Sequence, residues 1–310
     1  MGVRRFDLAA CDLGEVAGAK GGQTISVCIP CRDEAGTIGS LVSTIRHELV
    51  ERVALVDELI VLDDRSSDDT AEIAANSGAR VVSVDDIHAE HGEGHCKGNA
   101  LWASLLASSG DLVVWIDGDI TSFRPEWIAR LVAPLIDDES VALVKAMARR
   151  PTKMGGGGRT TELVARPLIS LYFPELAGLD QPLAGEYAGR RTVLESLPFV
   201  QGWGVEMALL IDVARTCGAS AIAQIDVGVR EHRHRALESL SVQAAEVMAT
   251  MLGRAPGAPP WGESVGVGEA VGVREAPSLR RADGSRVRLN LAERPSVASL
   301  RQGWPDANTT

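Results

Sequence analysis

The feature that most constrains the fold is a unit that repeats along the first half of this 310-residue chain. Each unit consists of a short, almost fully apolar run, a polar turn and a segment with helical periodicity. The apolar runs lie at 24–30, 58–63, 80–84 and 112–116, and another follows at 141–146. Such runs, alternating with helices, are typical of parallel strands covered on both faces. We therefore predict an α/β fold with a mostly parallel central sheet and helices on both faces.

The helices are predicted from apolar residues at helical spacing and from capping residues at the segment ends. They span 38–45, 70–77, 98–108, 162–171 and 205–213. From about Gly253 onward Gly, Pro and Arg dominate, and only 286–291 resembles a strand. We predict an extended C-terminal arm that packs on the body or on a partner subunit. A largely disordered tail is the alternative.

Polar residues follow three of the predicted strands directly, at 30–34, 63–69 and 117–119. In open α/β sheets, ligands bind outside the carboxyl ends of the strands. We therefore expect these three segments to converge on one binding site, although they are far apart in the sequence.

The last of these segments, Asp117-Gly118-Asp119, places two carboxylates on one tight turn. The two carboxylates repel each other unless a cation lies between them, and a hard divalent cation can also hold a diphosphate. An ordinary acidic surface turn has the same composition and is the alternative.

Lys97 and Gly98 stand at the start of the helix that precedes this turn. An ammonium group and free backbone N–H groups at a helix start suit a phosphate. The alternative is a solvated lysine.

Two groups of histidines resemble metal ligands by spacing. The segment 230–235 (REHRHR) would let one imidazole reach a metal while neighbouring guanidinium groups reach phosphate, whereas a solvated charged run is the plainer interpretation. For His88, His91 and His95 we favour a mobile loop over a second metal site.

The segment 155–158 (GGGG), followed by Arg159, Thr160 and Thr161, is either a flexible linker or a run of amides that wraps an anion. Arg149, Arg150 and Lys153 lie just upstream and make this region locally basic. That contrast within an acidic chain favours a small anionic ligand.

Composition excludes several classes of protein. The net charge of -11 disfavours nucleic acid as a partner, and the apolar runs are too short to span a membrane. Five irregularly spaced cysteines favour free thiols in a reducing compartment, so we expect a cytoplasmic protein. Cys28 and Cys31 form a C-x-x-C pair, but we favour a buried strand over a redox or zinc site there.

Several motifs, in order along residues 20–250, resemble the glucosyl-3-phosphoglycerate synthases, which are retaining glycosyltransferases of the GT-A fold, and the related mannosyl-3-phosphoglycerate synthases. The matching motifs are VDELIVLD at 56–63, SSDDT at 66–70, GGGR at 156–159, TELVARPL at 161–168, GEYA at 185–188 and GVE at 204–206.

The resemblance implies a donor site for a nucleotide sugar. Its base and ribose contacts would be Pro30, Cys31, Arg32, Asp33 and Glu34. Further nucleotide and diphosphate contacts would come from Asp64, Lys97, Asp117 and Gly118. Two pairs depart from the family pattern: Arg32-Asp33 stands where Leu-Asn is expected, and Asp64-Arg65 where Ser-Gly is expected.

The resemblance also implies the metal, the acceptor and the catalytic residues. Asp119 and His232, with Asp117, would hold Mg2+ or Mn2+, and Glu206 would face the transferred sugar. The acceptor-binding residues would be Gly158, Arg159, Thr161, Trp203, Arg230 and His234. Trp203 and His234 stand where Tyr and Asn are expected.

The implied reaction transfers glucose from UDP-glucose to the 2-hydroxyl of 3-phosphoglycerate, and GDP-mannose is the alternative donor. We expect an N-terminal extension at 1–23, a donor half at 24–120, an acceptor half at 121–252 and the arm at 253–310. The family resemblance implies a homodimer. A polyprenyl-phosphate transferase would want a membrane segment, which we do not find, and a dinucleotide dehydrogenase would need a G-x-G-x-x-G motif after the first strand.

Overall fold

A computed structural model of the chain describes residues 2–7, 11–149, 158–230, 237–257, 265–267, 270–272, 277–281 and 283–302. The first half contains β1 (Arg4–Phe6), α1 (Leu13–Ala19), β2 (Ile25–Cys31), α2 (Ile38–Ile45), β3 (Glu58–Asp63), α3 (Thr70–Asn76), β4 (Arg80–Ser83), α4 (Val84–His91), α5 (Cys96–Ala107) and β5 (Leu112–Trp115). A π-helical stretch, η1 (Arg46–Arg52), extends α2.

The second half contains α6 (Glu126–Asp137), β6 (Leu143–Arg149), η2 (Thr161–Ala165), α7 (Arg166–Tyr172), β7 (Tyr187–Arg190), α8 (Arg191–Leu194), β8 (Phe199–Val200), α9 (Val205–Cys217), β9 (Ile222–Val229) and α10 (Leu237–Gly253). Beyond it lie β10 (Val265–Val267), β11 (Ala270–Gly272), β12 (Ser278–Arg280), β13 (Arg286–Arg288), β14 (Glu293–Arg294) and α11 (Val297–Gln302). The short 3-10 helices are η3 (Pro174–Leu176) and η4 (Ala219–Ala221).

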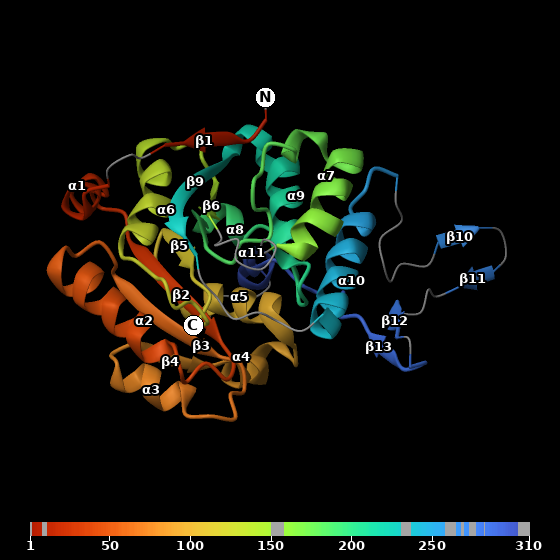
Figure 1. The fold of residues 1–310 in the computed structure, drawn as a ribbon, viewed down its shortest axis with the longest axis horizontal. Coiled ribbons are helices and arrows are strands. Elements are labelled where there is room, and N and C mark those ends of the chain that lie inside the picture. The colour runs from red at the N-terminus through yellow and green to blue at the C-terminus, as the bar shows by residue number, and fades with distance from the viewer. Residues whose placement is uncertain are drawn as a thin grey trace, which may run out of the picture.

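The central sheet has the order β1-β9-β6-β7-β5-β2-β3-β4, and helices pack on both of its faces (Figure 1). Strands β2, β3, β4 and β5 are parallel to their neighbours within the first half, which confirms the predicted repeat. β7 is antiparallel to both β5 and β6. The sheet is therefore mostly parallel, with one reversed strand that joins the two halves.

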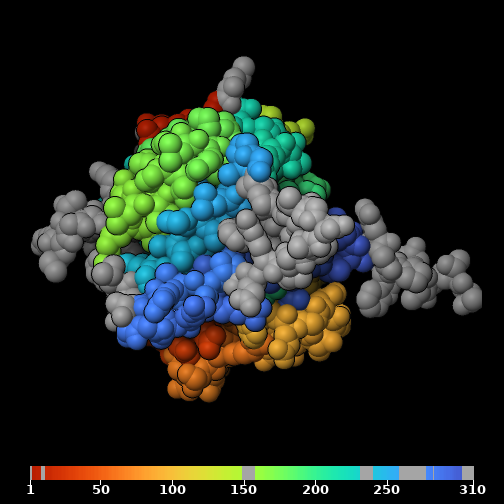
Figure 2. Space-filling view, turned by 90° about the vertical axis from the view of Figure 1, so that its right-hand side faces the viewer, coloured from red at the N-terminus to blue at the C-terminus, as the bar shows by residue number. Residues whose placement is uncertain are grey.

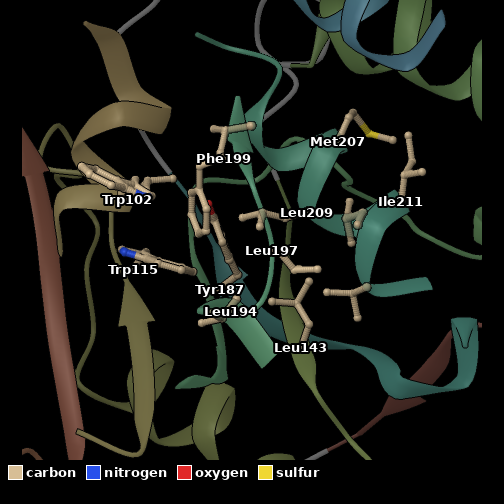
Figure 3. Close-up of a cluster of buried hydrophobic side chains, with 14 of the residues drawn as sticks. Trp102, Trp115, Leu143, Tyr187, Leu194, Leu197, Phe199, Met207, Leu209 and Ile211 are labelled. Atoms are coloured by element: carbon tan, nitrogen blue, oxygen red, sulfur yellow. The ribbon is translucent and has the colours of Figure 1, made fainter. Parts of the chain in front are cut away.

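Several of the largest side chains of the core meet where α5, β5, β7 and β8 pack together (Figure 3). The ring centroids of Trp115 and Tyr187 are 5.0 Å apart, and Phe199 lies edge-on to Trp115 at 6.3 Å. The Nε1 of Trp115 donates to Ser104 Oγ at 2.8 Å, so this buried indole keeps its hydrogen bond. The cluster fixes α5 against the strands whose ends carry the polar segments.

Two details differ from the sequence-based expectations. β2 continues through Pro30 to Cys31, because its pairing with β5 ends at Cys28 and the missing N–H is not needed on that side. The loop predicted around His88 and His91 is wrong, since both lie on α4. That helix is capped by Ser83, whose hydroxyl accepts from the backbone N–H of Asp85.

The C-terminal arm returns to the body after the β12–β13 hairpin. β14 pairs antiparallel with β8, and Trp102 Nε1 donates to the carbonyl of Pro295 at 2.7 Å. The expectation of an arm that packs on the body is confirmed for residues 289–302, where Leu289 and Val297 are buried.

We predict that Gly110→Ala destabilises the fold by about 1–3 kcal/mol. Gly110 precedes β5 and donates its N–H to Ser26 Oγ at 2.8 Å, and an added Cβ would lie 2.6 Å from Ser26 N. Gly22→Ala is the matched control, because a Cβ there meets nothing within 4 Å. Urea unfolding of the two variants measures the difference; equal midpoints would contradict the prediction.

Candidate active site

The acidic turn lies where β5 ends, against the loop that leads into β7. A Cβ at Gly185 would overlap the carboxylate of Asp117, and a Cβ at Gly118 would lie 2.6 Å from Cys31 Sγ. Glycine at both positions therefore lets the backbone approach the acidic turn from two sides. The 30–34 segment and the 117–119 segment meet here as predicted, since the added Cβ at Gly118 would also lie 3.4 Å from the carbonyl of Pro30 and 3.5 Å from Glu34 Cγ.

A chain of alternating charges runs through this turn. Lys97 Nζ lies 2.7 Å from Asp117 Oδ1 and 2.8 Å from Glu206 Oε1. Arg230 Nη2 lies 2.9 Å from Asp117 Oδ2 and 4.0 Å from Asp119 Oδ1, while its Nε donates to Glu186 Oε1 at 2.7 Å. The structure thus brings together Lys97, Asp117, Asp119 and Glu206, four residues selected from the sequence.

Burial and pairing both act on the protonation of this cluster. Burial lowers the pKa of Lys97, but the carboxylates of Asp117 and Glu206 outweigh it and hold that pKa above its ordinary value. The pKa of Arg230 is raised in the same way by Glu186 and Asp117 against the effect of burial. Burial raises the pKa of Glu186. Both cations therefore stay charged at neutral pH.

Two buried members of this region have little signal in the sequence. Glu186 lies within the GEYA motif without a predicted role, and no role is predicted for Lys145. Lys145 Nζ donates to the carbonyl of Ala184 and lies 4.0 Å from the centroid of the Tyr187 ring. Its ammonium group therefore lies against the loop that carries Glu186. Its signal in the sequence is one lysine within an otherwise apolar strand.

The predicted base-binding segments are joined by hydrogen bonds between loops. Asp33 donates its N–H to Ser66 Oγ at 3.0 Å and accepts from the backbone N–H of Ser67 at 2.6 Å. The hydrogen bonds from Ser67 lower the pKa of Asp33. Asp33 and Arg65 have positive φ angles of 57° and 59°, which non-glycine residues seldom adopt. Backbone strain of this kind concentrates at binding sites.

Asp64 is buried beside these loops, and its Oδ1 lies 3.8 Å from Arg65 Nη1. Burial raises the pKa of Asp64. Arg65 extends toward α4 and its following loop, where its Nε donates to Asp85 Oδ1 at 2.8 Å and its Nη1 lies 3.1 Å from His95 Nδ1.

The expected acceptor residues lie at several places. Gly158, with φ of 96°, accepts from the N–H of Glu162 at 2.9 Å, and Thr161 is buried at the start of η2. Trp203 follows β8, and its backbone N–H donates to Glu246 Oε2 at 2.8 Å. Arg230, expected on the acceptor side, binds Asp117 and Glu186. His232 and His234 lie outside the described residues, as does 155–157.

The donors at this site suit a hard divalent cation. Asp117 and Asp119 supply carboxylate oxygens, which Mg2+ and Mn2+ prefer. Counting Glu186 and Glu206, carboxylates outnumber the neighbouring cations Lys97, Arg230 and Lys145. Among the residues that the structure describes, no three His, Cys, Asp or Glu side chains are grouped so that they could hold a metal ion. The third expected ligand, His232, lies outside those residues. Asp117 and Asp119 fit the metal; His232 stays a prediction.

Comparison with known proteins identifies the family. The model of glycosyl transferase family 2 matches residues 26–196, which covers more than half of the chain. The chain belongs to glycosyl transferase family 2. It is an enzyme, and the carboxylates at the end of β5 lie within the matched region of this glycosyltransferase.

Individual relatives confirm the resemblance drawn from the motifs. The transferase is 44% identical to the glucosyl-3-phosphoglycerate synthase of Mycolicibacterium paratuberculosis over 93% of this chain and 88% of that protein. It is 48% identical to that of Mycobacterium tuberculosis over 78% of this chain and 76% of that protein.

Solved structures agree. The M. tuberculosis enzyme in complex with phosphoglyceric acid matches with a TM-score of 0.84 and 41% identity, covering 97% of this chain and 100% of that one. A complex of the same enzyme with Mn2+ and UDP-glucose matches with a TM-score of 0.83 and 41% identity, covering 96% of this chain and 99% of that one. The GT-A fold implied by the resemblance is therefore confirmed.

The buried ammonium of Lys145 predicts a pH dependence of stability. Burial lowers the pKa of Lys145 from 10.5 to about 8. Between these pH values the unfolded chain still holds the proton that the folded chain has released, so the free energy of unfolding from this group rises with pH.

We expect Lys145→Met to remove this rise. The wild-type free energy of unfolding, minus that of the variant, should increase by up to about 3 kcal/mol across this window. Urea unfolding at a series of pH values measures it, and parallel curves for the two proteins would show that Lys145 does not titrate there. Groups common to both proteins cancel in the difference.

Proposed function

We propose that this transferase moves glucose from UDP-glucose to the 2-hydroxyl of 3-phosphoglycerate, with retention of configuration. The observation that carries the proposal is the partly buried cluster of Lys97, Asp117, Asp119 and Glu206 at the carboxyl ends of the strands, in a chain similar over almost its full length to a glucosyl-3-phosphoglycerate synthase. GT-A structures similar to this chain hold UDP-glucose with Mn2+ or the product glucosyl-3-phosphoglycerate with UDP.

The donor is proposed to lie across the carboxyl ends of β2, β3 and β5. The uridine would contact the 30–34 segment and Asp64, and the diphosphate would lie beside Lys97 and Asp117. Lys97 is already held by two carboxylates, so its ammonium occupies one position rather than many. A group fixed in advance lowers the entropic cost of binding and stabilises charge that develops in the transition state.

Asp119, Asp117 and His232 are proposed to hold Mg2+ or Mn2+. The bound metal would supply electrostatic stabilisation of the departing diphosphate. Similar structures contain Mn2+ or Mg2+ together with UDP.

The acceptor is proposed to bind through Gly158, Arg159 and Thr161, with Trp203 and His234 on its other side. Arg159 and the backbone amides around Gly158 suit its phosphate and carboxylate. Arg230 is proposed to act by holding Asp117 and Glu186 in place, because both ion pairs are short and the Arg230 side chain is itself buried.

Transfer breaks the bond between the anomeric carbon and the diphosphate oxygen and forms a bond from that carbon to the acceptor 2-oxygen. The proton of the 2-hydroxyl passes to the departing diphosphate on the same face of the sugar. Glu206 is fixed by Lys97 at 2.8 Å and is proposed to face the glucose, where its carboxylate would orient the sugar and favour positive charge at the anomeric carbon.

We predict that the protein forms product from 3-phosphoglycerate and UDP-glucose in the presence of Mg2+. The release of UDP and the mass of the product measure the reaction. Asp119→Ala should lower kcat/KM by at least about a hundredfold, because the metal loses a ligand. EDTA should abolish turnover and Mn2+ should restore it. Asp57→Asn is the control, since Asp57 binds Lys20 and the N–H of Ile25 at the opposite end of β2 from the proposed site.

Several outcomes would contradict the proposal. Product with GDP-mannose but none with UDP-glucose would reassign the donor. Full activity in EDTA would reject the metal, and an absence of product with either donor would reject the acceptor.

Two further proposals concern the whole molecule. The first is a homodimer, supported by large apolar side chains exposed on neighbouring elements: Leu163 on η2 (76%), Leu171 (73%) and Tyr172 (40%) on α7, and Met248 (41%) on α10. The second is a cytoplasmic location, supported by five free thiols and by the small phosphorylated substrates. The boundaries at 24–120, 121–252 and 253–310 also remain part of this proposal.

The homodimer predicts that Leu163→Glu with Leu171→Glu yields a monomer, because charges would be buried at the interface. Analytical ultracentrifugation of the wild type and the variant measures the mass. Ser43→Glu adds a charge to the exposed side of α2 and should leave the dimer intact. A wild-type monomer would reject the proposal.

A further inference from the structure

The C-terminal segment 289–295 lies between the two halves of the molecule. In Figure 2, the blue C-terminal residues lie between the orange and gold elements of the donor half and the green and cyan helices of the other half. β14 pairs with β8, and the N–H of Gln201 donates to the carbonyl of Ala292 at 2.9 Å. The segment is thus joined by backbone hydrogen bonds to the loop that leads to Trp203.

Arg294 connects this segment to the loop before Lys97. Its side chain is buried, and its Nε donates to Asn99 Oδ1 at 2.8 Å. Its Nη1 and Nη2 donate to the carbonyls of His91 at 2.8 Å and Gly92 at 2.7 Å. These carbonyls end α4, where the helix leaves its acceptors without internal partners. The guanidinium also lies 4.7 Å from the centroid of the Trp102 ring.

Asn290 makes a second connection, from the same segment to the residues beside Lys97. Its Nδ2 donates to the carbonyl of His95 at 3.2 Å, and its backbone N–H donates to Glu246 Oε1 at 2.9 Å. The other oxygen of Glu246 accepts the N–H of Trp203. One short stretch of chain therefore touches the loop before Lys97 and, through Glu246, the loop that carries Trp203.

The loop from Gly92 to Lys97 needs such support. Gly92 and Cys96 have φ angles of 77° and 72°, and a left-handed cysteine persists only where its surroundings hold it. A Cβ at Gly94 would overlap Asn99 and Arg294, so the loop is packed directly against the arginine. Cys96 immediately precedes Lys97 and starts α5, and any shift of this loop moves the ammonium group.

We infer that residues 289–295 act as a clamp that sets the position of Lys97 in the donor site, with Arg294 and Asn290 as its positioning residues. The side chains of Arg294 and Asn290 act on the diphosphate side, because both donate to the loop before Lys97, whereas the contact toward Trp203 is made by the backbone N–H of Asn290 through Glu246. The kinetic part of the test rests on the proposed function, because it requires turnover of UDP-glucose. Binding of UDP requires no turnover and tests the inference separately.

The test compares Arg294→Ala and Arg294→Lys with Arg288→Ala. Arg288 is an exposed arginine of the same arm, on β13. We expect Arg294→Ala to raise the KM for UDP-glucose about tenfold while the KM for 3-phosphoglycerate changes less than about twofold. Arg294→Lys should keep most of the defect, because one ammonium cannot replace three directed donors. Arg288→Ala should match the wild type.

Binding of UDP to the protein in the presence of Mn2+, measured by titration, gives the independent readout. Arg294→Ala should lower the affinity for UDP by about the same factor. A folded Arg294→Ala protein with a lower melting temperature but wild-type KM and UDP affinity would show a structural role only and overturn the inference. If that variant does not fold, Asn290→Ala decides, because it removes one side-chain hydrogen bond; an unchanged UDP affinity there would also overturn it. If the wild-type protein binds UDP but forms no product, the proposed function is rejected. The effect of Arg294→Ala on the affinity for UDP then still tests the clamp.

Discussion

The site depends on a partly buried series of ion pairs in which Glu206, Lys97, Asp117, Arg230 and Glu186 alternate in charge. An isolated charge at this depth would lose its hydration, at a cost of several kcal/mol, and only a close opposite charge offsets that loss. Each residue comes from a different element of the fold. The sheet, the helices and the close approach of Gly185 to Asp117 must therefore all be correct for any one pair to form.

The parts of this arrangement that follow from local chemistry could be predicted. A continuous apolar run such as 58–63 must be buried on both faces, and the strand has those bounds. Parallel strands bring their carboxyl ends to one edge, so Asp117 and Lys97 could be placed together before any coordinates were known. The GT-A fold itself and the relation to the synthases came from motifs rather than from periodicity.

The remaining contacts had no local signal. Arg294 and Asn99 are 195 residues apart in the sequence, and nothing in either neighbourhood indicates the other. Arg230 belongs to a basic run that suits an anion, yet the fold turns it toward two carboxylates. α4 is short and polar, and its capping by Ser83 outweighs its weak periodicity. Tertiary packing decides such cases, because local propensities there differ by less than the energy of one buried contact.

At the donor edge, two residues hold a backbone conformation that side chains seldom adopt. Asp33 and Arg65 stand where the resemblance leads us to expect Asn and Gly, the residues that best tolerate a positive φ, and both adopt such a conformation at 57° and 59°. An arginine there costs about 1–3 kcal/mol of backbone strain. Hydrogen bonds from its guanidinium to Asp85 and to the carbonyl of Gly94 offset that cost. Arg65 therefore places a positive charge beside the proposed nucleotide site and ties the end of β3 to the loop before Lys97.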